Sequence, residues 1–118
     1  MSWGYHLTLD CMEGNIKKIT DGNHIKRFSE DLVNSIEMIA YGDPIVEHFA
    51  THEPDKAGYS LVQLIETSNI CAHFVDKNGD FYVDIFSCKE FDIEIAKQVV
   101  IDYFEPKHIK ESFMERDA

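Results

Sequence analysis

The stretch from Gly58 to Ser87 reads GYSLVQLIETSNICAHFVDKNGDFYVDIFS and specifies the centre of a β-sheet. Within it, Tyr59–Ile65 places successive side chains on alternate sides, which is the period-two pattern of a half-buried strand. Asn69–Val75 and Phe81–Ser87 are expected to be the next two strands, and the Asn78-Gly79 pair between them is a strong signal for a hairpin turn. The stretch therefore predicts three consecutive antiparallel strands.

A further strand and a helix are expected upstream. Trp3–Cys11 alternates in the same way and predicts a strand. From Asn23 to Tyr41, apolar residues recur at spacings of three and four, which predicts an amphipathic helix with Asn23 as its N-cap. Gly42 and Pro44 are expected to end this helix, and residues 12–22 before it are expected to form a loop.

The remaining segments complete one mixed fold. Ile45–Phe49 predicts a short strand, Asp92–Phe104 a second helix that Pro106 ends, and Lys107–Met114 a last strand. The order is β-α-β-β-β-β-α-β in a single domain of 118 residues. We therefore expect an α+β fold, a two-layer sandwich in which both helices cover one face of an antiparallel sheet. The uncovered face still needs burial, which favours a homodimer that packs sheet to sheet.

The composition is that of an acidic globular protein. Lys and Arg total 11 against 22 Asp and Glu, which leaves a formal net charge of −11. Because such a surface repels phosphate groups, binding to nucleic acid or to an anionic membrane is not expected. No apolar run reaches the roughly 20 residues of a membrane span, and the first residues lack the basic and apolar regions of a signal peptide. A cytoplasmic location is therefore expected.

Cysteine and histidine spacings give no support for a metal site. Cys11, Cys71 and Cys88 form no CxxC pair, so neither a disulfide framework nor a cysteine-based zinc site is expected. His48 and His52 are four residues apart, a spacing that suits a metal ion only on a helix. Because that segment has an extended pattern, we expect no metal there.

A polar corner, Glu66-Thr67-Ser68-Asn69, interrupts two apolar strands. His73 and Cys88 lie on strands that the Asn-Gly turn brings side by side, so a hydroxyl, an imidazole and a thiol could converge on one region of the sheet. The alternative is structural, because short polar residues often make turns, a strand histidine is commonly hydrogen-bonded, and cysteines are often small buried hydrophobes. These residues by themselves leave both interpretations open.

Four chemically reactive positions carry a resemblance to a known family. These positions are Ser60, Ser68, His73 and Cys88, and the successive spacings between them are eight, five and fifteen residues. In addition, Val83–Cys88 reads VDIFSC, and GYHL occupies positions 4–7. In spacing and motifs the chain resembles the prokaryotic S-adenosylmethionine decarboxylase proenzyme, whose pattern includes VD-[LI]-F-[ST]-C and G-x-H-L. Its acidic, compact form resembles the copies carried by some bacteriophages.

The resemblance implies that the chain cuts itself. Ser68 would attack the carbonyl of Thr67, convert that peptide bond into an ester, and split the chain by β-elimination into residues 1–67 (the β chain) and 68–118 (the α chain). Ser68 would become a covalent pyruvoyl group, which replaces an external cofactor or metal and forms a Schiff base with the substrate amine. The implied reaction is decarboxylation of S-adenosylmethionine, which yields the aminopropyl donor for spermidine biosynthesis.

The resemblance also implies roles for individual residues. Ser60 and His73 would assist processing, with His73 as the base that removes the α-proton of Ser68. Cys88 would return a proton to the substrate carbon, and Glu66 would lie in the substrate-binding corner. In the family, two protomers pack sheet to sheet and both contribute to each site. Since residues five apart on a strand point to opposite faces, we expect the chain to bend at the corner so that Ser68 meets His73.

The chain departs from the family pattern around the expected cleavage site. Thr67 stands where Glu is usual, Asn69 stands where His is frequent, and Phe74–Lys77 replaces the common Thr-Trp-Pro-Glu. These departures affect substrate contacts more than the processing residues. They leave two alternatives, a pyruvoyl-dependent decarboxylase of ornithine or arginine, and a non-catalytic dimeric homologue that binds or regulates a partner.

Overall fold

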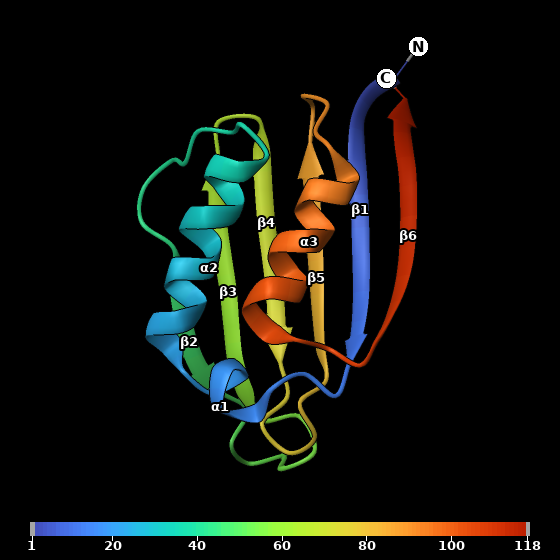
Figure 1. Ribbon diagram of the computed structural model, residues 1–118. Coiled ribbons are helices and arrows are strands. Elements are labelled where there is room, and N and C mark those ends of the chain that lie inside the picture. The colour runs from blue at the N-terminus through green and yellow to red at the C-terminus, as the bar shows by residue number, and fades with distance from the viewer. Residues whose placement is uncertain (1, 118) are drawn as a thin grey trace.

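Six antiparallel strands form one sheet in the computed structural model, which describes residues 2–117. The strands are β1 (Ser2–Met12), β2 (Ile45–Phe49), β3 (Gly58–Ile65), β4 (Ser68–Phe74), β5 (Phe81–Ser87) and β6 (His108–Asp117). Their order is β2-β3-β4-β5-β1-β6, so β4 and β5 are central. The helices are α1 (Ile16–Ile19), α2 (Gly22–Ser35) and α3 (Ile93–Phe104). Figure 1 shows α2 and α3 lying across the same face of the sheet, which confirms the predicted α+β sandwich.

The core between the sheet and the helices is rich in aromatic rings. Phe74 and Phe81 from adjacent strands stack with ring centroids 5.4 Å apart, and Phe104 of α3 packs on both, at 4.9 and 5.1 Å. Phe28 of α2 packs edge-on against Phe104 at 4.8 Å. All four rings are completely buried, and one cluster therefore joins both long helices to the sheet. Burial of rings of this size is a major source of stability in a small domain.

The alternating pattern of β3 is confirmed. Leu61, Gln63 and Ile65 are buried beneath the helices, whereas Val62 and Leu64 between them are exposed on the other side of the sheet. Within residues 2–117 no helix covers that other side. The sheet therefore has a core face and an uncovered face, which we call the open face.

Helix α2 begins at Gly22, and its N-cap is Asp21 instead of the predicted Asn23. The Asp21 carboxylate accepts hydrogen bonds from the backbone N–H groups of Asn23 and His24, at 3.0 and 3.2 Å. A charged oxygen here satisfies two otherwise free donors and interacts favourably with the helix dipole. The preceding segment was predicted as a loop, but it contains the short helix α1, which Asn15 caps.

The predicted end of this helix at Tyr41 is wrong, because α2 ends at Ser35. The chain then runs beside the end of β3, where the Tyr41 N–H donates to the Leu64 carbonyl at 2.8 Å. The Glu66 N–H donates to the Ile39 carbonyl at 2.9 Å. These bonds to a distant segment replace the intrahelical bonds that a longer helix would have made.

A Schellman motif closes α2, with Glu37 in the position where glycine is preferred. The Glu37 N–H donates to the Asn34 carbonyl at 3.1 Å, and the Met38 N–H donates to the Val33 carbonyl at 2.9 Å. Glu37 has a φ of 59°, in the left-handed region that a Cβ disfavours. Because no glycine marks this turn, the apolar periodicity continues past it and predicts too long a helix.

We expect Glu37→Gly to stabilise the fold by about 1 kcal/mol, because glycine adopts a left-handed φ without the steric cost of a Cβ. Glu37→Ala is the matched control, since it removes the same exposed carboxylate and keeps the Cβ. Urea unfolding should give a higher midpoint for Glu37→Gly than for Glu37→Ala at an unchanged slope. Equal midpoints for the two variants would contradict backbone strain at Glu37.

Candidate active site

The polar corner is a two-residue turn between β3 and β4. Ile65 pairs with Ser68 across it, so Glu66 and Thr67 are the two central residues. Ser68 is the first residue of β4 and pairs on its other side with Ser87 of β5. Ser68 is half-buried, whereas Glu66 is exposed. The Thr67–Ser68 peptide bond therefore lies where the turn enters the centre of the sheet.

The end of β5 holds the carbonyl group of this peptide bond. The Cys88 N–H donates to the Thr67 carbonyl oxygen at 3.0 Å. The Ser87 hydroxyl donates to Thr67 Oγ1 at 2.7 Å. Cys88 is exposed, so its side chain is accessible at the same end of the sheet as Ser68. We call Thr67, Ser68, Ser87 and Cys88 the turn cluster.

Ser60 and His73 face each other across β3 and β4. The Ser60 hydroxyl lies 2.7 Å from His73 Nδ1, and His73 Nε2 lies 2.8 Å from the Lys56 carbonyl oxygen. A carbonyl oxygen can only accept, so Nε2 carries the hydrogen of the neutral ring and Nδ1 is its basic nitrogen. The Ser60 hydroxyl then donates to Nδ1. This Ser60–His73 pair therefore has one tautomer, whose lone pair is directed at Ser60.

The turn cluster and the Ser60–His73 pair do not meet within one chain. β4 keeps an unbroken register with both neighbouring strands from Ser68 to His73, so the expected bend at the corner is wrong. Along a paired strand, five residues span about 17 Å. The two side chains also point to opposite faces of β4, because five is an odd number of residues. The predicted residues thus form two groups at opposite ends of the strand.

The Ser60–His73 pair lies on an apolar open face. Val62, Leu64 and Tyr82 on this face are 37%, 48% and 45% exposed. Exposed Ile45 of β2 pairs with Val62 and extends the apolar surface. A shallow hollow of about 320 Å³ lies beside the pair, and Asp84 adds a carboxylate to its wall. Exposed apolar side chains gathered on one face are typical of protein interaction surfaces.

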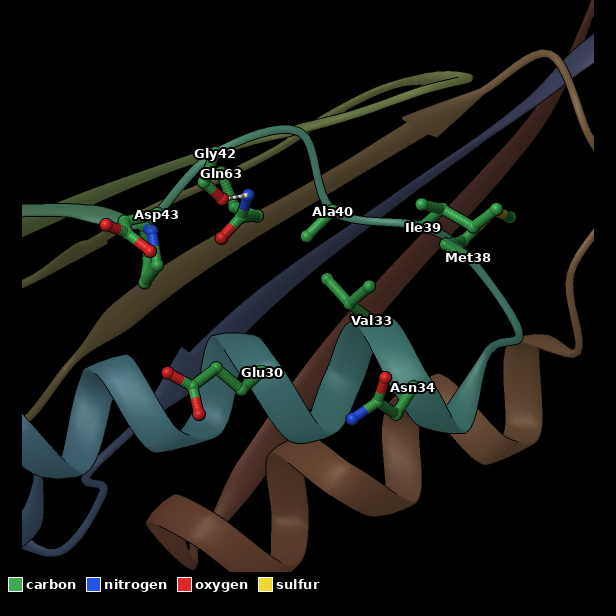
Figure 2. Close-up of a pocket in the computed structure, with 10 residues that line it drawn as sticks. Glu30, Val33, Asn34, Met38, Ile39, Ala40, Gly42, Asp43 and Gln63 are labelled. Atoms are coloured by element: carbon green, nitrogen blue, oxygen red, sulfur yellow. Dashed lines mark hydrogen bonds between the residues drawn. The ribbon is translucent and has the colours of Figure 1, made fainter.

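A second hollow lies between α2 and the chain that follows it, as Figure 2 shows. Its volume is about 500 Å³, and Glu30 and Asp43 are the carboxylates among its lining residues. The amide of buried Gln63 donates to the Gly42 carbonyl at 3.2 Å in this region. No member of the turn cluster or of the Ser60–His73 pair lines the hollow. It is therefore separate from the candidate active site.

His48 lies on the edge strand β2, and His52 follows that strand in the chain. His48 Nε2 lies 2.6 Å from Asp76 Oδ2, so this ring is engaged by a carboxylate. Across residues 2–117 no three His, Cys, Asp or Glu side chains are close enough together to hold a metal ion. In the same part of the chain, every helix is too short or too polar to span a membrane.

Burial separates two of the cysteines from Cys88. Burial raises the pKa of the Cys11 thiol to about 12, and the neighbouring Asp10 carboxylate adds to the effect. Burial also raises the pKa of Cys71, and Asp84 adds to that effect. Since the thiolate is the reactive form, exposed Cys88 is the thiol most available for chemistry.

We expect iodoacetamide at pH 8 to alkylate Cys88 first, Cys71 more slowly, and Cys11 only after unfolding. The raised pKa values leave less thiolate at Cys11 and Cys71, and burial keeps the reagent from Cys11. Peptide mapping by mass spectrometry at timed intervals measures the order, and urea-unfolded protein, in which all three react, is the control. Modification of Cys11 or Cys71 before Cys88 would contradict this assignment.

Comparison with known proteins identifies the family. Residues 5–117 match the family model described as S-adenosylmethionine decarboxylase. The crystal structure of the adenosylmethionine decarboxylase from Aquifex aeolicus VF5 is similar at a TM-score of 0.82 and 22% sequence identity, over 99% of this chain and 92% of that one. A search of curated proteins found no significant match, and these comparisons give no support to a bacteriophage source. Because the family model spans nearly the whole chain, the chain belongs to the S-adenosylmethionine decarboxylase family.

Proposed function

We propose that this chain is a proenzyme that cuts its own Thr67–Ser68 bond and converts Ser68 into the pyruvoyl group with which it decarboxylates S-adenosylmethionine. Decarboxylation of S-adenosylmethionine, a step toward polyamines, is the activity of the family, and the family match does not favour ornithine or arginine as substrate. The observation that carries the proposal is the Cys88 N–H contact with the Thr67 carbonyl oxygen, in the bond that precedes the Ser68 hydroxyl.

The first step turns the Thr67–Ser68 peptide bond into an ester. Ser68 Oγ bonds to the carbonyl carbon of Thr67, the bond from that carbon to the Ser68 nitrogen breaks, and the hydroxyl proton ends on the freed amine. During the attack, negative charge develops on the Thr67 carbonyl oxygen. The Cys88 N–H, 3.0 Å from this oxygen, is a fixed donor that stabilises the charge.

The second step breaks the chain. A base removes the Cα proton of residue 68, the bond from its Cβ to the ester oxygen breaks, and the Thr67 carboxylate leaves as the end of residues 1–67. The unsaturated residue that remains takes up water and releases ammonia, which leaves a pyruvoyl group at the start of residues 68–118. Such a group supplies a ketone for the substrate amine and accepts the electrons released with CO₂.

The surroundings of residue 68 fit this cofactor. Residue 68 pairs with Ile65 on one side and Ser87 on the other, so the β5 pairing can hold its backbone in place after the turn is cut. Cys88 is exposed at the same end of the sheet. The Cys88 thiol can act as the acid that returns a proton to the substrate carbon after CO₂ leaves. Glu66 is exposed on the turn and available for contact with the substrate.

A second copy of the chain supplies the base in this proposal. The Ser60–His73 pair offers a basic Nδ1, but it lies on the open face at the far end of β4 from Ser68. When two copies pack open face to open face about a two-fold axis, the backbone of residue 68 in one sheet can lie against the His73 end of the other, although the Ser68 side chain points to the core face. The apolar open face, with Val62 and Leu64 exposed, favours this packing.

We expect intact-mass measurement of the purified protein to show two fragments, residues 1–67 and 68–118, with a pyruvoyl group at the start of the second. Ser68→Ala removes the attacking oxygen and should leave one full-length chain. The cut protein should release CO₂ from S-adenosylmethionine, and ornithine and arginine are the control substrates. A chain that stays whole under native conditions would favour the non-catalytic alternative instead.

We also expect two uncut variants to restore cleavage when they share a dimer. Ser68→Ala keeps the Ser60–His73 pair, and His73→Ala keeps Ser68 and Cys88. After mixing and refolding, about half of the dimers should be mixed, and the His73→Ala chains in them should be cut. The masses of the fragments identify which chain was cut. Each variant refolded alone is the control, and a mixture without fragments would place the site within a single chain.

A further inference from the structure

A directed chain of hydrogen bonds fixes the side chain of Thr67. The Lys89 N–H donates to Ser87 Oγ at 3.0 Å. The Ser87 hydroxyl donates to Thr67 Oγ1 at 2.7 Å, and the Thr67 hydroxyl donates to Met38 Sδ at 3.3 Å. Ser87 Oγ also lies 3.7 Å from Met38 Sδ. Because each hydroxyl has one hydrogen, the shorter contacts of 2.7 and 3.3 Å favour the direction from Ser87 through Thr67 to Met38. Thr67 is thus held by both β5 and the segment that follows α2.

Ser87 occupies a position where an apolar residue is expected. It lies on the core face of β5, after Val83 and Ile85 on the same face, and its exposed fraction is 0%. A buried hydroxyl costs stability unless it is hydrogen-bonded. The shortest hydrogen bond that Ser87 makes is the one to Thr67. The polar side chain therefore serves a specific contact with the residue before the proposed cleavage site.

Ser87, the last residue of β5, and Cys88 directly after it thereby hold Thr67 at two points. Ser87 holds its side chain through Oγ1, and the Cys88 N–H holds its carbonyl oxygen. With both contacts in place, the Thr67 peptide plane cannot rotate freely about the turn. The carbonyl carbon then keeps one orientation toward Ser68, and such orientation is a large part of the advantage of an intramolecular reaction.

We propose that Ser87 is a positioning residue for self-cleavage, which acts through Thr67 to hold the scissile carbonyl for attack by Ser68. This inference rests on the proposed cleavage of the Thr67–Ser68 bond. Ser87 contributes to ester formation, in which Ser68 Oγ replaces the Ser68 nitrogen on the Thr67 carbonyl carbon. It takes no part in the later removal of the Cα proton, for which His73 is the proposed base.

The test measures the rate of self-cleavage by intact mass in freshly folded protein. Ser87→Ala and Thr67→Val each remove one hydroxyl of the contact and should slow cleavage roughly tenfold to a hundredfold. Ser87→Thr and Thr67→Ser keep the hydroxyl and should stay within a few-fold of the unmodified chain. Because Thr67→Val changes a half-buried side chain to one of nearly the same shape, it tests the contact even if Ser87→Ala folds poorly.

Hydroxylamine separates positioning from a general loss of structure, because it cuts esters and spares amides. His73→Ala should accumulate the ester and be cut rapidly by hydroxylamine. Ser87→Ala forms the ester slowly, so hydroxylamine should accelerate its cleavage little. Ser29→Ala is the matched control, since Ser29 is also a completely buried serine, on α2, and bonds to Gln63 instead of the turn. It should be cut at the unmodified rate.

The outcomes distinguish this inference from the function on which it rests. If the unmodified chain is cut and Ser87→Ala is cut equally fast, or is cut rapidly once hydroxylamine is added, Ser87 does not position the carbonyl. If Ser29→Ala is also cut slowly, general destabilisation explains the slow cleavage of Ser87→Ala, and the inference is overturned. If the unmodified chain stays whole even with hydroxylamine, the proposed cleavage itself is wrong. The role inferred for Ser87 is then wrong as well.

Discussion

The hydrogen bond from the Cys88 N–H to the Thr67 carbonyl joins the β3–β4 turn to the end of β5. It exists because β3, β4 and β5 keep one continuous register, which brings a tight turn and a strand end to the same level of the sheet. A slip of one residue in either pairing would turn every side chain of a strand to the other face. The burial pattern that selects the register therefore also places the carbonyl beside its donor.

Local patterns predicted β3, β4 and β5 correctly because each of these strands buries one face. In β3, Leu61 and Ile65 are buried and Val62 is exposed, so alternation along the chain contains the required information. The end of α2 could not be predicted in this way. It depends on a left-handed glutamate, Glu37, and on a hydrogen bond from Glu66, which lies far along the sequence. Long-range bonds of this kind leave no periodic signal.

The sequence proposes residues for the candidate site but does not predict how they are arranged. The spacing of Ser60, Ser68, His73 and Cys88 selects these side chains as candidates, but the expected bend that would join Ser68 to His73 is absent from β4. Ser87 was overlooked, although a signal was present in the sequence. A hydroxyl at a core-facing position of an alternating strand is unusual, and it indicates that the hydroxyl has a specific hydrogen-bond partner.

In the proposed dimer, a motif spaced along one chain describes a site that two chains form. Each copy must contribute both halves, so both halves are present in one sequence although Ser68 and His73 never meet within it. A bend that joined them would break ladder hydrogen bonds in a central strand and expose the core. Packing of two open faces avoids this cost, because it covers Val62 and Leu64 and brings the opposite ends of β4 together. Packing of two open faces would thus both bury the open face and supply the base that acts on residue 68.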